Sequence, residues 1–168
     1  MQAVEVRSVV AGWTRQEVYE RLKDGEVYVK YAPEQVKSVR TENGPDPRTA
    51  LTHWEIYFRN GVLSWSEVDL YDDDAYTIRF TQIDGDFDIF EGAWCVDEDE
   101  DDLILTFTAD FDFGVPSMES IVNPVALRVL RHAMSEIVSK LFGGKVIDDD
   151  PAGSVGAPAP APARSRGR

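Results

Sequence analysis

The feature that most constrains the fold of this chain is a run of six extended segments separated by short turn signals. They span 36–42, 50–59, 62–71, 75–83, 86–97 and 103–113. Asn60-Gly61 is the sharpest turn signal, because two residues that tolerate positive φ suit a two-residue hairpin. Strands joined this tightly are antiparallel neighbours. The sequence therefore predicts one antiparallel sheet laid out as a meander.

A shorter strand and one or two short helices precede the meander. The segment 4–10 alternates like a strand, and Thr14 and Glu17 form a capping box that predicts a helix to about Leu22. The segment 26–32 fits either a short helix or an extended piece.

A long amphipathic helix follows the meander. Apolar residues recur at three-to-four spacing across 125–142 and form one stripe. Asn123-Pro124 offers a cap and a first-turn proline, and an earlier start near Ser117 is also compatible. Gly143-Gly144 supplies the stop. A sheet that curves around this helix buries both apolar surfaces and leaves a cavity between them.

The predicted fold class is therefore α+β, with a curved antiparallel sheet of about seven strands wrapped around a long C-terminal helix. Residues 1–147 form the predicted domain. Residues 148–168 read DDDPAGSVGAPAPAPARSRGR, and alternating Ala-Pro suits neither a helix interior nor a central strand. We expect this segment to be a disordered tail.

Net charge narrows the class of partner. The chain carries 31 acidic and 17 basic residues, a net charge of −14. It therefore repels phosphate backbones and anionic lipids, which disfavours nucleic-acid and membrane partners. No stretch has the length of a membrane helix, and MQAVEVRS lacks the features of a signal peptide. With a single cysteine, Cys95, we expect a cytoplasmic protein.

The sequence contains no established catalytic motif. GxSxG, a phosphate-binding glycine-rich loop and HExxH are all missing. His53 and His132 lie in different predicted elements and lack a His or Cys partner at ligand spacing. We expect no metal and no cofactor, and a structural or half-exposed role for both histidines.

The predicted strands carry an unusual number of large aromatic residues. Core packing explains any single ring, but a solid core favours Leu, Ile and Val. Trp and Tyr also suit a pocket wall, because each joins an apolar ring to a polar atom. The rings belong to Trp54, Phe58, Trp65, Tyr76, Phe80, Phe90, Trp94, Phe107 and Phe111.

The segment 62–71 presents two mixed faces. One face carries Leu63, Trp65, Glu67, Asp69 and Tyr71, and the other carries Val68 and Leu70. If Trp65 faces the interior, Glu67 and Asp69 face the interior too. Burial there would raise the pKa of each carboxyl and make each a candidate general base. If Val68 and Leu70 face the interior, both acids are solvated. The alternation alone leaves both orientations open.

The order of elements resembles the START-like superfamily. Three runs carry the resemblance: IDGDFDIFEGAW (83–94), LTFTADFDF (105–113) and VNPVALRVLRHAMSEIVSKLFG (122–143). Within the superfamily the chain is similar to the polyketide cyclase/dehydrase group, which includes single-domain aromatase/cyclases and ubiquinone-binding Coq10-type proteins. The resemblance covers residues 3–143 and implies a helix-grip fold, in which the C-terminal helix closes a deep cavity against the sheet.

The resemblance also implies which residues form the site, and it favours the inward orientation of the strand over 62–71. The candidate catalytic residues are Glu67, Asp69 and Tyr31. The candidate substrate-binding residues are Tyr28, Trp54, Trp65, Phe80, Phe90, Trp94, Phe107 and Met134.

One departure from the family bears on the reaction. Aromatase/cyclases use a cavity arginine on the strand that matches 62–71, and Asp69 stands at the matching position. The missing cation disfavours aromatising aldol chemistry and favours ring closure of a polyketide by cycloaddition, in which shape does most of the work. A non-catalytic quinone or lipid carrier is the alternative. The expected partners are a small-molecule polyketide and a carrier protein of a polyketide synthase, with the chain a monomer or a homodimer.

We expect the domain to tolerate loss of residues 148–168, because the deletion removes no residue of an apolar stripe. The melting temperature of the truncated chain should stay within about 1 °C of the full-length value. A fall of several degrees in differential scanning fluorimetry would show that the tail docks on the domain.

Overall fold

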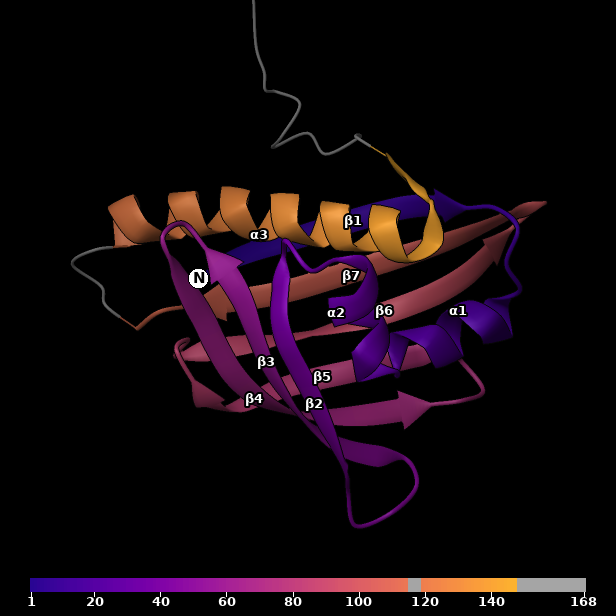
Figure 1. Cartoon of the computed structure of the whole chain (residues 1–168), viewed down its shortest axis with the longest axis horizontal. Coiled ribbons are helices and arrows are strands. Elements are labelled where there is room, and N and C mark those ends of the chain that lie inside the picture. The colour runs from indigo at the N-terminus through magenta and orange to yellow at the C-terminus, as the bar shows by residue number, and fades with distance from the viewer. Residues whose placement is uncertain (115–118, 148–168) are drawn as a thin grey trace, which may run out of the picture.

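The computed structural model describes residues 1–114 and 119–147 and confirms the α+β helix-grip architecture (Figure 1). The strands are β1 (Gln2–Val10), β2 (Val36–Asn43), β3 (Thr49–Phe58), β4 (Gly61–Asp72), β5 (Thr77–Gly85), β6 (Ile89–Asp99), β7 (Asp102–Asp112) and β8 (Lys145–Ile147). The helices are α1 (Arg15–Leu22), α2 (Gly25–Tyr31) and α3 (Glu119–Phe142). In the described ranges, no helix combines the length and apolarity that a membrane crossing needs.

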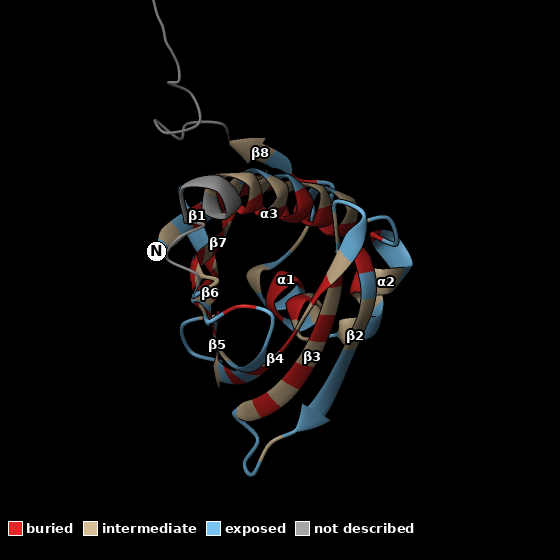
Figure 2. Ribbon diagram, turned by 90° about the vertical axis from the view of Figure 1, so that its left-hand side faces the viewer, coloured by how far each residue is buried: buried red, intermediate tan, exposed pale blue. Residues whose placement is uncertain are grey.

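The sheet is a meander closed by the first strand. Its order is β2-β3-β4-β5-β6-β7-β1-β8, and every pair of neighbours is antiparallel. Figure 2 shows the strands curving as a half-barrel with α3 lying across the open side and the buried faces turned inward. The interior therefore lies between the concave face of the sheet and the three helices.

The short elements correct or complete the sequence-based prediction. The sheet has one strand more than the seven expected, because Val146 pairs with Ser8 of β1. The ambiguous segment after Asp24 is helical, since the Asp24 side chain caps α2 by accepting from the Glu26 amide at 3.1 Å. The Thr14 capping box is present as predicted.

One turn and one helix start lie slightly away from their predicted positions. Phe58 pairs with Gly61, so the β3–β4 loop consists of Arg59 and Asn60, one residue earlier than expected. Helix α3 begins before Asn123, which places Pro124 inside the helix and not at its first position. The alternative start at Ser117 and the predicted tail over 148–168 lie outside the described residues.

A bulge bends the sheet next to the interior. Ser66 of β4 pairs with Asp84 while Glu67 pairs with Gln82, so Ile83 is an extra residue on β5. A bulge of this kind increases the local twist and bends the strand that carries it. The bend lies beside Glu67, where the sheet turns toward the helices.

Two side chains fix the end of α3 to the start of the chain. Trp13 Nε1 donates to the Phe142 carbonyl oxygen at 2.9 Å, and Arg21 Nε donates to the Leu141 carbonyl oxygen at 3.1 Å. These carbonyls have no partner within the helix, and a cation there also favours the helix dipole. The contacts hold α1 and α3 together on one side of the interior.

Gly92 on β6 is a position where the neighbouring backbone leaves no room for a side chain. A Cβ at this residue would lie 2.7 Å from the Ala109 Cα of β7. Gly92→Ala should therefore lower the free energy of unfolding by about 2–4 kcal/mol, because one of the paired strands must move. Gly61→Ala is the matched control, since its added Cβ meets only the Phe58 carbonyl oxygen at 3.9 Å. Urea denaturation of both variants measures the difference, and equal stabilities would contradict this account.

Candidate functional site

Two adjoining compartments lie between the sheet and the helices. The outer one holds about 20 Å³ of free space and reaches Gly25 of α2 and Val39 of β2. The inner one holds about 10 Å³ of free space and reaches Met134 of α3. Trp54, Glu67 and Trp94 line both, so the two compartments adjoin.

The inner compartment collects the aromatic residues that the sequence singled out. Seven of the eight predicted substrate-binding residues line it: Trp54, Trp65, Phe80, Phe90, Trp94, Phe107 and Met134. The space is narrow, because Trp54 stacks on Trp65 and Phe80 stacks on Phe107, each with ring centroids 5.7 Å apart. The eighth predicted residue, Tyr28, lines the outer compartment. Their role in binding stays a prediction.

Tyr31 does not belong to the site. Its side chain is 40% exposed, and the Arg21 guanidinium lies 4.5 Å from its ring centroid on the outer surface. The expectation that Tyr31 faces the cavity is wrong, because α2 is a helix that turns Tyr28 inward and leaves Tyr31 at its exposed end. Arg21 and then Lys30 lower the pKa of the Tyr31 hydroxyl, but nothing in the cavity is within its reach.

The orientation of β4, which the sequence left open, is settled by burial. Glu67 and Asp69 are each 5% exposed and lie on the buried face with Trp65. Val68 and Leu70 are exposed on the opposite face. Two carboxyl groups therefore lie side by side within a largely aromatic interior.

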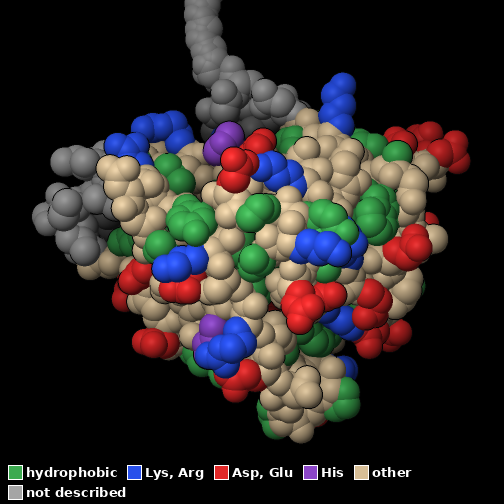
Figure 3. Space-filling view, in the orientation of Figure 1, with side chains coloured by type: hydrophobic (Ala, Val, Ile, Leu, Met, Phe, Trp, Pro, Cys, Tyr) green, Lys and Arg blue, Asp and Glu red, His purple; other side chains and the backbone are tan. Residues whose placement is uncertain are grey.

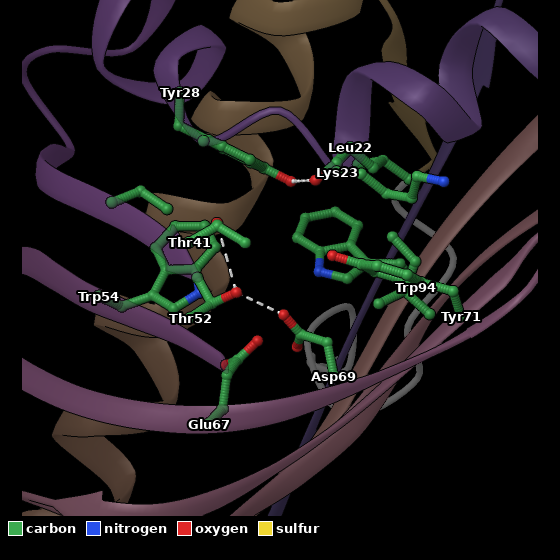
Figure 4. A pocket seen from close by; sticks show the side chains of 13 residues that line it. Leu22, Lys23, Tyr28, Thr41, Thr52, Trp54, Glu67, Asp69, Tyr71 and Trp94 are labelled. Carbon is green, nitrogen blue, oxygen red and sulfur yellow. Dashed lines mark hydrogen bonds between the residues drawn. The ribbon is translucent and has the colours of Figure 1, made fainter. Parts of the chain in front are cut away.

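Hydrogen bonds hold each carboxyl in place, and Figure 4 shows the one made by Asp69. Trp65 Nε1 donates to Glu67 Oε1 at 2.8 Å. Thr52 Oγ1, from the neighbouring strand β3, donates to Asp69 Oδ2 at 2.5 Å. Thr41 Oγ1 of β2 lies 3.4 Å from the Thr52 hydroxyl and extends the chain of hydrogen bonds toward the mouth. Tyr28 is fixed at the same mouth, since its hydroxyl donates to the Leu22 carbonyl oxygen at 2.6 Å.

Burial raises the pKa of both carboxyls, but the two carboxyls shift each other's pKa in opposite directions. The pKa of Glu67 lies well above its ordinary value because of burial, and the hydrogen bond and charge of Asp69 raise it further. Trp65 and Trp54 oppose this rise only in part. Burial also raises the pKa of Asp69, while Glu67 and Thr52 lower it. The pair therefore holds one proton to higher pH than an isolated acid would, and Glu67 is its main holder.

The only cation among the residues that line the two compartments stands at the mouth. Lys23 Nζ lies 3.3 Å from Glu20 Oε1 and 3.9 Å from Asp73 Oδ1, so its charge is already paired. The described interior thus presents acids and rings to a ligand, and no group that neutralises an anion.

Comparison with known proteins identifies the family. The sequence matches the family described as polyketide cyclase / dehydrase and lipid transport over residues 13–138. The chain belongs to this family. No curated protein matches the chain.

Solved structures of this family's fold agree over most of the chain. TTHA0849 from Thermus thermophilus aligns with a TM-score of 0.75 at 19% identity, covering 84% of this chain and 95% of that one. The Zhui aromatase/cyclase from Streptomyces sp. R1128 aligns with a TM-score of 0.73 at 16% identity, covering 84% and 92%. The di-domain aromatase/cyclase StfQ of the steffimycin pathway aligns with a TM-score of 0.67 at 13% identity, covering 84% of this chain and 50% of that one. At these identities the likeness shows the fold.

The sequence did not predict two features of the interior. Thr52 holds Asp69, and its signal was present, because alternation places it on the same face of β3 as Trp54 and Ile56. Phe87 was placed in the extended segment 86–97, where alternation puts it on the face opposite Phe90, whereas it lies in the β5–β6 loop. It is nevertheless buried and stacks on Phe90, with ring centroids 4.5 Å apart.

The histidines lie away from the cavity. His53 lies on the outer face of the sheet, where Nδ1 is 2.6 Å from Ser66 Oγ and Nε2 is 2.7 Å from Glu42 Oε2. His132 is exposed on α3. Among the described residues, no group of three or more His, Cys, Asp and Glu side chains is placed to hold a metal.

The raised pKa of Glu67 predicts a dependence of stability on pH. The unfolded chain loses this proton near pH 4.5, the ordinary value, whereas the folded chain keeps it to higher pH. Unfolding therefore releases a proton above pH 4.5, and the free energy of unfolding falls as pH rises, by up to about 1.4 kcal/mol per pH unit. Glu67→Gln removes this titration, so the stability of the variant relative to the wild type should increase as the pH rises above the ordinary value of 4.5. Urea titrations at each pH measure the difference, and a constant difference would contradict the shift.

Proposed function

We propose that this protein is a polyketide cyclase that binds a flexible polyketide in the aromatic-lined site and promotes its ring closure. The observation that carries the proposal is the buried Glu67–Asp69 pair, of which Glu67 lines both compartments and Asp69 lines the outer one. Membership of the family and the aromatase/cyclases among the solved structures support it.

The aromatic walls would supply orientation. A flexible chain loses conformational freedom when it closes into a ring, and a narrow site removes that freedom on binding. The stacked rings of Trp54 and Trp65 and the pair of Phe80 and Phe107 present flat apolar surfaces that suit conjugated carbon chains. Folding the chain against these surfaces would bring distant carbons within reach of each other.

The carboxyl pair would supply general acid–base chemistry. In a closure of this kind, the Asp69 carboxylate takes a proton from a carbon between two carbonyls, and that carbon attacks a distant carbonyl of the same chain. Protonated Glu67 then gives its proton to the new alkoxide, so that the proton of the pair has moved from one acid to the other. The sequence argument against this route was the missing cavity cation. A protonated Glu67 beside Asp69 offers an acid in its place.

Cycloaddition, the route favoured by the sequence, uses the same site without moving a proton. Shape would align the two reacting ends of the chain, and protonated Glu67 would donate a hydrogen bond to a carbonyl that activates one of them. The two routes differ in whether the Asp69 carboxylate is needed. We favour the acid–base route, because a buried pair that shares a proton has little use in a purely shape-driven reaction.

Amide substitutions separate the two routes. With a synthetic linear polyketide thioester as substrate, Asp69→Asn should lower kcat by about 10²–10⁴-fold and leave KM nearly unchanged, because the amide keeps the shape and removes the base. Glu67→Gln should lower kcat in the same way. Trp65→Ala is the matched variant, which changes the shape of the site and keeps both acids. Near-wild-type turnover of both amides beside an inactive Trp65→Ala would contradict acid–base catalysis and support cycloaddition.

A non-catalytic carrier of a quinone or lipid is the second candidate. The apolar lining of the inner compartment favours it, as does the lipid transport in the family description. A carrier has no need of two buried acids, because burial disfavours the ionisation of such groups. Tight binding of a quinone that quenches tryptophan fluorescence, with no turnover of any polyketide chain, would favour the carrier.

The proposal extends to setting and partners. The reaction needs no cofactor, because the pair performs both proton transfers. The substrate would arrive free or attached to the carrier protein of a polyketide synthase. The single cysteine, Cys95, fits a cytoplasmic location.

A further inference from the structure

Each carboxyl of the buried pair has a hydrogen-bond donor of its own. The Trp65 indole donates to Glu67 Oε1 at 2.8 Å, and the Thr52 hydroxyl donates to Asp69 Oδ2 at 2.5 Å. A hydrogen bond also joins the two carboxyls to each other. A proton can therefore pass between Glu67 and Asp69 without leaving the site, and the groups around the pair decide which acid holds it.

The Thr52 contact favours the ionised form of Asp69. Its distance lies in the range of hydroxyl-to-carboxylate hydrogen bonds, which are stronger than those between neutral groups. A hydroxyl has one proton to donate, and Thr41 Oγ1, 3.4 Å away, lies on the accepting side of Thr52 (Figure 4). Strand register fixes the contact, because Thr52 pairs with Glu67 and so lies diagonally across from Asp69.

Glu67 occupies the less favourable place for a charge. It lines both compartments and so reaches the aromatic inner one, whereas Asp69 lines only the outer one, together with Thr52. Burial is the largest cause that raises the pKa of each acid, and the Thr52 hydroxyl opposes it only at Asp69. The resting pair therefore carries its proton on Glu67 and its charge on Asp69.

The other titratable groups among the described residues that line the two compartments are Tyr28 of α2, Tyr71 of β4 and Lys23. Burial, and then the charges of the two acids, raises the pKa of Tyr28 well above its ordinary value, and the same causes raise the pKa of Tyr71 to about 12. Both phenols therefore keep their protons while the pair titrates. Lys23 is paired with Glu20 and Asp73 at the mouth.

The proposed ring closure leaves the pair in the opposite state. Asp69 then holds the proton taken from carbon, and Glu67 has given its own proton to the alkoxide. Before the next turnover, the O–H bond of Asp69 must break and an O–H bond of Glu67 must form. The hydrogen bond between the two carboxyls is the path for this transfer, which exchanges no proton with the solvent.

We infer that Thr52 is a positioning residue that returns the proton from Asp69 to Glu67 and so resets the pair after each ring closure. It acts through Asp69, whose ionised form its hydroxyl stabilises. The inference rests on the proposed function, which supplies the ring closure. Without this hydroxyl, Asp69 would retain the proton that it takes, and the acid and the base of the pair would be exchanged.

An NMR titration of the carboxyl carbons in the unliganded protein tests the position of the proton without a substrate. In the wild type, Asp69 should lose its proton at lower pH than Glu67. Thr52→Val removes the hydroxyl and keeps the shape of the side chain, so Asp69 should lose its proton at a pH about one unit higher. Thr52→Ser should restore the wild-type order. Thr106→Val is the matched control, because it makes the same change on β7 at a half-buried residue that lines neither compartment.

The pH profile of turnover tests whether the reaction uses this proton. With the linear polyketide thioester, Thr52→Val should lower kcat about 10-fold, the change in equilibrium that one pKa unit represents, and leave KM nearly unchanged. The acidic limb of the profile should move to higher pH, because Asp69 must be ionised to act as the base. Thr52→Ser should restore both. A purely structural role of Thr52 would lower stability without moving this limb.

An Asp69 titration that Thr52→Val leaves unchanged, or an acidic limb that stays in place, would overturn the inference. An equal shift in Thr106→Val would also overturn it and assign the effect to packing. Turnover of the thioester by the wild type would then keep the proposed function standing. Absence of turnover by the wild type would remove the proposed function, and the reset with it, whatever the titration shows.

Discussion

Burial of two adjacent carboxyl groups on β4 is the arrangement on which the rest of the site depends. An isolated buried carboxylate is strongly unfavourable, and two of them side by side are worse. The structure reduces this penalty with the indole N–H of Trp65, the hydroxyl of Thr52 and a proton held mainly by Glu67. The same features that make the pair tolerable also give it one acid and one base.

The fold brings the pair to the bottom of a site that opens at one end. The bulge at Ile83 bends the sheet beside Glu67, and α3 covers the concave face. Trp13 and Arg21 tie the end of α3 to the segment that leads into the mouth. Figure 3 shows acidic and basic side chains distributed over the outer surface, with no broad apolar face in that view. The aromatic side chains that line the two compartments are inside.

The described interior is aromatic and acidic, with no cation inside it. Under the proposed ring closure, the reaction would therefore have no fixed cation to rely on. In that proposal, protonated Glu67 would be the neutral donor for a developing negative oxygen. A pocket of this kind favours un-ionised ligands, because ionised ones would bring a second charge into a low-dielectric space.

The sequence by itself determined the strands, the long helix and the set of rings that line the inner compartment, because alternation and helical periodicity depend only on local spacing. It could not orient β4, whose two faces are both mixed, and it placed Tyr31 in the cavity wrongly. Tertiary structure decided both. Closure of the curved sheet against α2 and α3 buries the face with Trp65, Glu67 and Asp69, and leaves Tyr31 at the end of a helix that faces water. The burial that leaves Glu67 holding a proton depends on depth, and the partnership of Asp69 with Thr52 depends on strand register; no local pattern records either.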